Sequence, residues 1–153
     1  MTATSKLTQL DWRIRRFVYT FWIEHERPPF VKETAVQFAL GKDAARASYR
    51  RLETAHHWLL DQDVNQIRMA FPLSAVPTSY QVHVQGQSLW ANCAWDSLGI
   101  PAMLDADAQI EARDPLTQEV VRYEVRTGIL RAPQRVVHFV LPVRQWYDDL
   151  IHT

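Results

Sequence analysis

The stretch of residues 89–101 reads LWANCAWDSLGIP and contains the only cysteine of this 153-residue sequence. Asp96 follows Cys93 by three residues, and on a helix this spacing brings two side chains to the same face. A thiol beside a group that accepts or donates a proton suits a soft metal or an activated sulfur nucleophile. We expect the large side chains of Trp90 and Trp95 to exclude water from this pair. The alternative is a buried structural cysteine, since free Cys is among the most buried residue types.

The composition is that of a soluble globular protein, with 47% hydrophobic and 22% charged residues. The length predicts one ordinary domain or two small lobes that share a core. No apolar run reaches the roughly 18 residues that cross a membrane, and no signal-peptide core is evident. One cysteine cannot form an internal disulfide, so we expect a cytoplasmic protein without a membrane partner. Residues 1–70 carry 11 Lys and Arg against 8 Asp and Glu, a mild excess that permits nucleic-acid contact.

The first half of the sequence has helical periodicity. Apolar spacing of three and four residues predicts a helix over 9–25, and further helices are predicted over 31–40 and from 43 toward 60. The third helix carries an apolar stripe of Ala45, Tyr49, Leu52 and His56. Polar turn residues between apolar segments over 59–71 predict a small hairpin, or wing. Residues 1–71 are therefore predicted to form a winged helix-turn-helix lobe.

The second half has mainly strand patterning. Alternating apolar residues or apolar runs predict strands over residues 80–84, 107–113, 119–126 and 134–141. Residues 87–98 are interpreted as the helix or turn that carries the cysteine, closed by Gly99 and Pro101. Residues 72–153 are thus predicted to form a mostly antiparallel sheet with one helix. The fold class predicted for the whole chain is α+β.

Other common functional motifs are weak or missing from the sequence. Lys42, Arg46 and Arg50 recur every four residues on the third helix, as in a DNA-recognition helix or a solvated face. DNA-binding surfaces are usually much more positive, so a solvated face is favoured and DNA remains an open partner. The histidine spacings match no zinc motif, and no glycine-rich phosphate loop or G-x-S-x-G elbow occurs.

Two segments together resemble the organomercurial (alkylmercury) lyases. Residues 71–82 read FPLSAVPTSYQV and residues 89–98 read LWANCAWDSL, similar to a Pro-Thr strand followed by L-[YW]-A-x-C-A-x-D-x-L in that family. The family also has an N-terminal winged helix-turn-helix lobe, so the resemblance covers nearly the whole chain. It implies cleavage of a carbon–mercury bond by protonation, releasing a hydrocarbon and bound Hg(II), with no organic cofactor. Cys93 would then be the mercury-binding thiolate and Asp96 the proton shuttle.

This chemistry suits the two residue types. Thiolate is a soft ligand for a thiophilic metal, and its electron density makes the carbon bound to mercury more basic. A nearby acid can then deliver the proton that breaks the bond. An ordinary thiol titrates near ~8.5, so Asp96 can help by accepting its proton. An ionised Asp96 also disfavours the thiolate by repulsion, and the sequence leaves open which effect dominates.

The sequence departs from the family where a second active-site cysteine is usual, near the C-terminal end. Residues 143–149 read VRQWYDD there, with aspartates in place of a cysteine pair. Asp148 is therefore a third candidate site residue, and small external thiols could supply the missing sulfur. The alternative function is a non-catalytic relative that binds a thiophilic metal or ligand, as a winged-helix sensor or DNA-binding regulator. A third interpretation makes Cys93 inert packing, and no oligomeric state is predicted.

Overall fold

The computed structural model describes residues 6–61, 66–134, 136, 137, 139, 142, 145 and 146. Within that part of the chain the helices are α1 (Gln9–His25), α2 (Val31–Gln37), α3 (Lys42–Thr54) and α4 (Ala94–Leu104). The strands are β1 (Leu59–Leu60), β2 (Ile67–Ala70), β3 (Leu73–Ser74), β4 (Tyr80–Val84), β5 (Gln87–Ala91), β6 (Ala108–Arg113), β7 (Val120–Arg126) and β8 (Ile129–Arg131). This mixture of helices and antiparallel sheet confirms the predicted α+β class.

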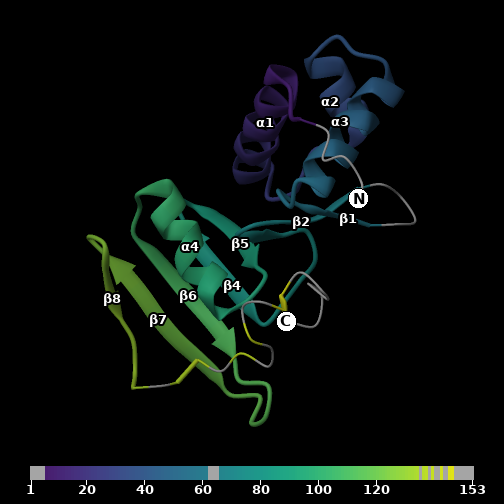
Figure 1. The fold of residues 1–153 in the computed structure, drawn as a ribbon. Helices are drawn as coiled ribbons and strands as arrows, with labels where there is room; N and C mark the ends of the chain where they lie inside the picture. The colour runs from purple at the N-terminus through teal and green to yellow at the C-terminus, as the bar shows by residue number, and fades with distance from the viewer. Residues whose placement is uncertain are drawn as a thin grey trace.

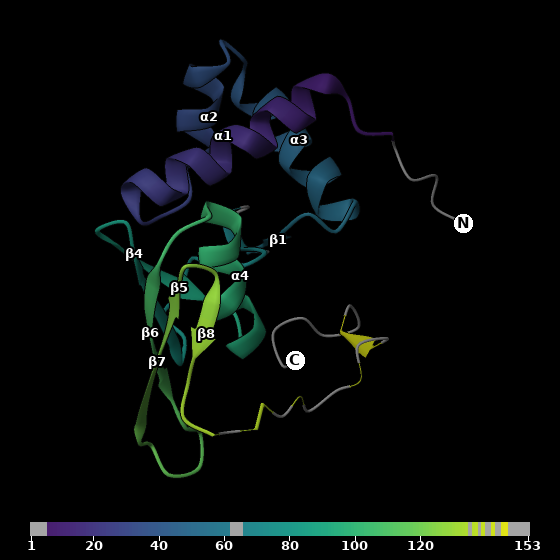
Figure 2. The same ribbon diagram turned by 90° about the vertical axis from the view of Figure 1, so that its left-hand side faces the viewer.

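The helices α1 to α3 gather at one end of the molecule, and α4 lies against the sheet (Figure 1). The second view shows α1 to α3 above the sheet and α4 (Figure 2), and α4 packs against β4, β5 and β6. None of the helices in the described part is long and apolar enough to cross a membrane. The three N-terminal helices precede the β1–β2 hairpin in the predicted order.

A buried ion pair fixes the start of α1 against α3. Thr8 caps α1, and Asp11 completes the cap by accepting the backbone N–H of Thr8. Asp11 is fully buried and also accepts hydrogen bonds from Ser48 and from the Arg51 guanidinium at 2.7 Å. These bonds outweigh the effect of burial, and the pKa of the Asp11 carboxyl lies well below its usual value. Asp11 is therefore an ionised structural carboxylate.

The third helix ends earlier than the sequence predicted. Ala45, Tyr49 and Leu52 are buried as expected, but α3 ends at Thr54 and His56 lies beyond it with a φ of 59°. Leu59–Leu60 belongs to β1, because this segment pairs with β2. Helical periodicity could not locate this end, since the competing interaction is a strand pairing with residues that come later in the chain.

Among the described residues the strands form one sheet in the order β1-β2-β3-β5-β4-β6-β7-β8, with antiparallel pairing throughout. The pairs Met69↔Ser74 and Ser74↔Trp90 carry it across residue 72, where the two predicted lobes would meet. Apolar residues of β4, β5 and β6 pack with Ile100 of α4 in a core shared with α1 and α3. The division into lobes of residues 1–71 and 72–153 remains a prediction.

The cysteine-bearing segment folds differently from its prediction. Its first part, Gln87–Ala91, is β5, and the helix runs on through Gly99 and Pro101 to Leu104. A Cβ on Gly99 would lie 3.2 Å from the Pro72 side chain, so the missing side chain lets α4 approach this loop closely. Glycine and proline here are internal helix residues, and reading them as stop signals was wrong.

The predicted strand over 134–141 was also wrong in its described residues, because residues 134, 136, 137 and 139 lie outside any strand. The strand after β7 is β8, and Thr127 and Gly128, both with positive φ, form the turn between them. A two-residue turn of this kind pairs the strands at once. The strands predicted over 80–84, 107–113 and 119–126 are confirmed as β4, β6 and β7.

Candidate functional site

Cys93 lies where β5 ends and α4 begins. Its backbone is extended, it is the N-cap of α4, and its Sγ accepts a hydrogen bond from the Asp96 N–H at 3.5 Å. Ser and Thr are favoured at N-caps because a hydroxyl oxygen accepts this bond well, whereas sulfur is a weak acceptor. The helix start therefore places a thiol, rather than an efficient cap, at the positive end of the helix dipole.

The structure brings Cys93 and Asp96 together, as the three-residue spacing predicted, although the cysteine precedes the helix. The thiol and the carboxyl interact electrostatically, and each side chain changes the pKa of the other. The Asn92 amide donates a hydrogen bond to Asp96 Oδ2 at 3.1 Å. The Cys93 thiol and the Asp96 carboxyl are therefore neighbours at the start of α4.

The sequence left open whether Asp96 promotes or disfavours ionisation of the Cys93 thiol, and the electrostatics of the pair bear on this question. Burial raises the pKa of the Cys93 thiol, and the negative charge of Asp96 raises it further. These two effects are larger than the decrease caused by the backbone N–H groups of Asp96 and Trp95. Burial also raises the pKa of the Asp96 carboxyl, against the hydrogen bonds from Asn92 and Cys93. Both groups retain protons more readily than in water, and burial with repulsion dominates over activation by the helix terminus.

Two tyrosines of the sheet face the thiol from the α4 side. Burial raises the pKa of Tyr80 on β4 and of Tyr123 on β7, and the charge of Cys93 raises both further. Ser97 Oγ donates to Ala94 O at 2.6 Å, so the Tyr123 hydroxyl must donate to Ser97 Oγ across their 2.7 Å separation. The Tyr123 oxygen keeps its acceptor lone pairs, and this wall of the site is polar.

The N-terminal half reaches the same site through Tyr19 of α1. Its hydroxyl donates to Phe71 O at 2.8 Å, across 52 residues of sequence. Burial raises the pKa of Tyr19 and the charge of Asp96 adds to the increase, while Arg15 opposes it. The guanidinium carbon of Arg15 lies 4.9 Å from the centre of the Tyr19 ring. A side chain from the N-terminal half of the chain is therefore close enough to feel the charge of Asp96.

The expectation that tryptophans shield the pair was wrong. Trp95 is 65% exposed. Trp90 alternates with the buried Leu89 and Ala91, and therefore points to the opposite face of the sheet from α4. Tyrosines line the site instead. The strand alternation of Tyr80 with Val82 could have signalled this, but nothing local assigns Tyr19 or Tyr123 to the site.

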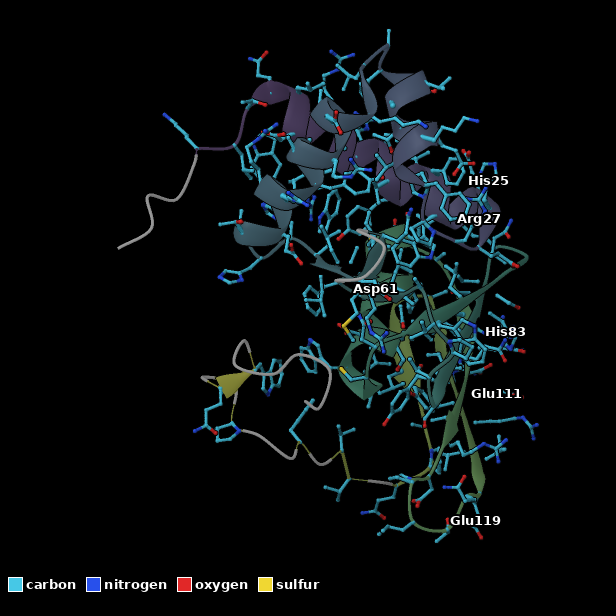
Figure 3. The ribbon with its side chains drawn as sticks, turned by 90° about the vertical axis from the view of Figure 1, so that its right-hand side faces the viewer. His25, Arg27, Asp61, His83, Glu111 and Glu119 are labelled. Atoms are coloured by element: carbon cyan, nitrogen blue, oxygen red, sulfur yellow. The ribbon has the colours of Figure 1, made fainter. Side chains whose placement is uncertain are left out.

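The opposite face of the sheet carries a separate polar cluster. His83 shares a hydrogen bond with Ser88 at 2.9 Å, and Glu111 accepts one from Arg122 at 2.7 Å. Figure 3 shows His83 and Glu111 on the side of the sheet away from α4. Across the described ranges, no group of three or more His, Cys, Asp or Glu side chains could hold a metal ion.

The remaining candidate residues are Asp148 and the basic residues of α3. Asp148 lies outside the described residues. Lys42, Arg46 and Arg50 lie on α3, where Arg46 forms an ion pair with Asp43 at 2.8 Å. An exposed pair of this kind is typical of a solvated helix face. Contact of this helix with DNA remains an untested prediction.

Comparison with known proteins shows to which family the chain belongs. The family model described as MerB, alkylmercury lyase, matches residues 73–151, the part that contains β3 to β8 and the Cys93–Asp96 pair. This chain belongs to the alkylmercury lyase family. The search of curated proteins found no match.

The crystal structure of the mercury-bound form of MerB2 is similar to this chain, with a TM-score of 0.65 and 27% sequence identity. The similarity covers 83% of this chain and 61% of the MerB2 chain. The alkylmercury lyase chain described here therefore spans about three fifths of the length of that relative. The likeness extends beyond the residues that the family model matches, into the N-terminal helices or the hairpin that follows them.

Proposed function

We propose that this chain is an organomercurial lyase, with Cys93 as the mercury-binding thiolate and Asp96 as the proton shuttle. The observation that carries the proposal is the pairing of the Cys93 thiol with the Asp96 carboxyl at the start of α4, where burial raises the pKa of both groups. Membership of the alkylmercury lyase family supports the choice of substrate. A carboxyl with a raised pKa is suited to accept a proton and then to donate it again.

The reaction starts with exchange of ligands on the substrate. The organomercurial R–Hg–X gives up X⁻ as Cys93 sulfur binds the mercury, and the thiol proton passes to Asp96. Formation of the strong sulfur–mercury bond compensates for loss of a proton from a thiol whose pKa is raised. The product of this step is R–Hg–S(Cys93) beside a neutral carboxylic acid.

Protonolysis follows within the same pair. Asp96 gives its proton to the carbon, and the electron pair of the carbon–mercury bond becomes the new carbon–hydrogen bond. The hydrocarbon R–H leaves and mercury remains as Hg(II), so no oxidant or reductant is consumed. A small external thiol supplies the second sulfur ligand, increases the electron density at carbon and removes Hg(II) by exchange.

The test is benzene release from phenylmercury acetate in the presence of excess small thiol, followed by gas chromatography. We expect catalytic turnover by the full chain and no release above the thiol-only rate from Cys93→Ser. Equal release by the two proteins would rule out the lyase proposal.

A second candidate is stoichiometric mercury binding without turnover. The raised pKa of Cys93 favours it, because a protonated thiol activates carbon poorly. In this case Cys93 takes up one equivalent of phenylmercury and no benzene forms. A regulator of this kind would also bind promoter DNA with an affinity that falls with salt and with loss of Arg46 or Arg50.

A further inference from the structure

The Asn92 side chain precedes the cysteine and is held in place through its backbone. Asn92 N–H donates to Pro72 O at 3.4 Å, and the preceding carbonyl of Ala91 accepts the Thr78 hydroxyl at 2.6 Å. Both anchors belong to the loops that flank β3. A short side chain on a fixed backbone has few χ1 rotamers, and the bond to Asp96 orients the amide group about χ2.

The nitrogen and the oxygen of the Asn92 amide differ in their hydrogen bonding. Its Nδ2 donates to Asp96 Oδ2, whereas its Oδ1 is buried without a hydrogen-bond partner among the described residues. The bond to Asp96 is therefore the hydrogen bond that the Asn92 side chain makes within the described part of the chain.

Asp96 needs such a partner because its other contact is the thiol. When mercury replaces the thiol proton, the interaction of the thiol with the carboxyl is lost. The amide bond then becomes the contact that orients the carboxyl group toward the sulfur and the carbon bound beyond it. Misplacement of a reacting group by about 1 Å can cost about 100-fold in rate.

We propose that Asn92 is a positioning residue that holds the Asp96 carboxyl beside the Cys93 sulfur after the thiol proton has left. This inference rests on the proposed lyase function. It assigns Asn92 no contact with the transferred proton, and it predicts a defect in the rate of cleavage rather than in mercury binding.

The test uses Asn92→Leu, which keeps the volume of the side chain and removes the donor. We expect kcat for phenylmercury cleavage to fall about 10- to 100-fold, with KM changed less than about 3-fold because Cys93 still binds mercury. Asn92→Gln retains an amide donor and should recover part of the rate. Gln109→Leu, on an exposed position of β6, is the matched control and should change neither parameter.

A second measurement does not depend on turnover. Three-bond couplings to the Asp96 β-protons, measured on the full chain loaded with one equivalent of Hg(II), should report one χ1 rotamer in the natural chain and averaged rotamers in Asn92→Leu. An unchanged rotamer, or an unchanged kcat in an active protein, would overturn the inference. Absence of benzene release from the natural chain would instead refute the lyase proposal, and the couplings would still test whether Asn92 positions Asp96.

Discussion

The N-termini of α1 and α4 share one capping bond and have opposite electrostatics. Each helix has an aspartate three residues after its N-cap, and the N–H of this aspartate donates to the cap side chain, at 3.2 Å to Thr8 and 3.5 Å to Cys93. At α1 the aspartate also accepts the N–H of its cap residue, which completes a capping box. Asp11 also receives the Arg51 guanidinium and has a lowered pKa. Asp96 receives a hydrogen bond from the neutral amide of Asn92 and interacts with the thiol, and its pKa is raised.

The difference shows that a capping motif does not set the ionisation state of its carboxylate. Both carboxylates are buried or half-buried, which alone raises a carboxyl pKa. A cation contributed by a distant helix reverses the effect at Asp11, whereas the partners of Asp96 are neutral or anionic. One motif thus gives a structural ion pair in the first case and a candidate proton shuttle in the second.

The largest effect is expected from exchanging the cap atom of α4. Cys93→Ser replaces a weak sulfur acceptor with a good one, so the free energy of unfolding should stay the same or rise by up to about 1 kcal/mol. Phenylmercury cleavage should fall at least about 1,000-fold, because hydroxyl is a hard and poor ligand for mercury. Urea unfolding and benzene release measure the two quantities. A less stable variant that retained activity would contradict both halves of this expectation.

Removing the charge at the other terminus should mainly affect stability. Asp11→Asn leaves the partly buried Arg51 without its counter-ion and should lower the free energy of unfolding by about 3 kcal/mol. Asp43→Asn, whose carboxylate is 98% exposed in its pair with Arg46, is the matched control and should change it by less than about 0.5 kcal/mol. Chemical denaturation of the three proteins provides the measurement, and equal stabilities would refute a structural role for Asp11.

Asp96→Asn should show the reverse pattern. Loss of the shuttle should reduce benzene release about 100-fold. Stability should be unchanged or slightly higher, because the variant removes a buried charge that no cation compensates in the contacts described above. Full activity in this variant would assign proton transfer to another group.

The pH dependence of stability should separate the two carboxylates. The folded-state pKa of Asp11 is below its unfolded value near ~3.9, so its contribution is complete above that value and is lost as pH falls through the folded pKa. The pKa of Asp96 is raised, so its contribution is most favourable at low pH and declines as pH rises from about 4 through its folded pKa. Thermal unfolding from pH 2 to 7 should therefore show a smaller acid destabilisation in Asp11→Asn than in the natural chain.

Tyr19→Phe should give the smallest effect. The variant loses the hydrogen bond to Phe71 O and should be destabilised by about 1 kcal/mol, a change in melting temperature of a few degrees. Activity should change less than about 3-fold, since Tyr19 lines the site without a hydrogen bond to the reacting pair. Calorimetry and the benzene assay on the same sample test this, and a larger loss of rate would give Tyr19 a direct part in the reaction.

The sequence was sufficient for elements whose stabilising contacts are local. Helical spacing located α1 to within a residue, and alternation located β4, β6 and β7. The three-residue spacing also identified the Cys93–Asp96 pair, since an N-cap and its third helical residue are neighbours in any sequence.

The rest depended on contacts between distant segments. The end of α3 is fixed by pairing of β1 with β2, and the passage of α4 through Gly99 depends on its fit against Pro72. Tyr80 and Tyr123, which respond to the charge of Cys93, and Tyr19, which responds to Asp96, come from three elements that only the folded chain brings together. The raised pKa of Cys93 likewise depends on burial, which a residue pattern does not quantify.

The continuity of the sheet across residue 72 bears on how this protein could be shortened or recombined. A fragment that began at residue 72 would lose the partner strand of β3 and expose an unpaired edge beside β5, the strand that leads into Cys93. It would also lose Tyr19 of α1, which interacts electrostatically with Asp96. The motif-bearing half is therefore not a transferable module, and grafting the chemistry onto another scaffold would require the helical half as well.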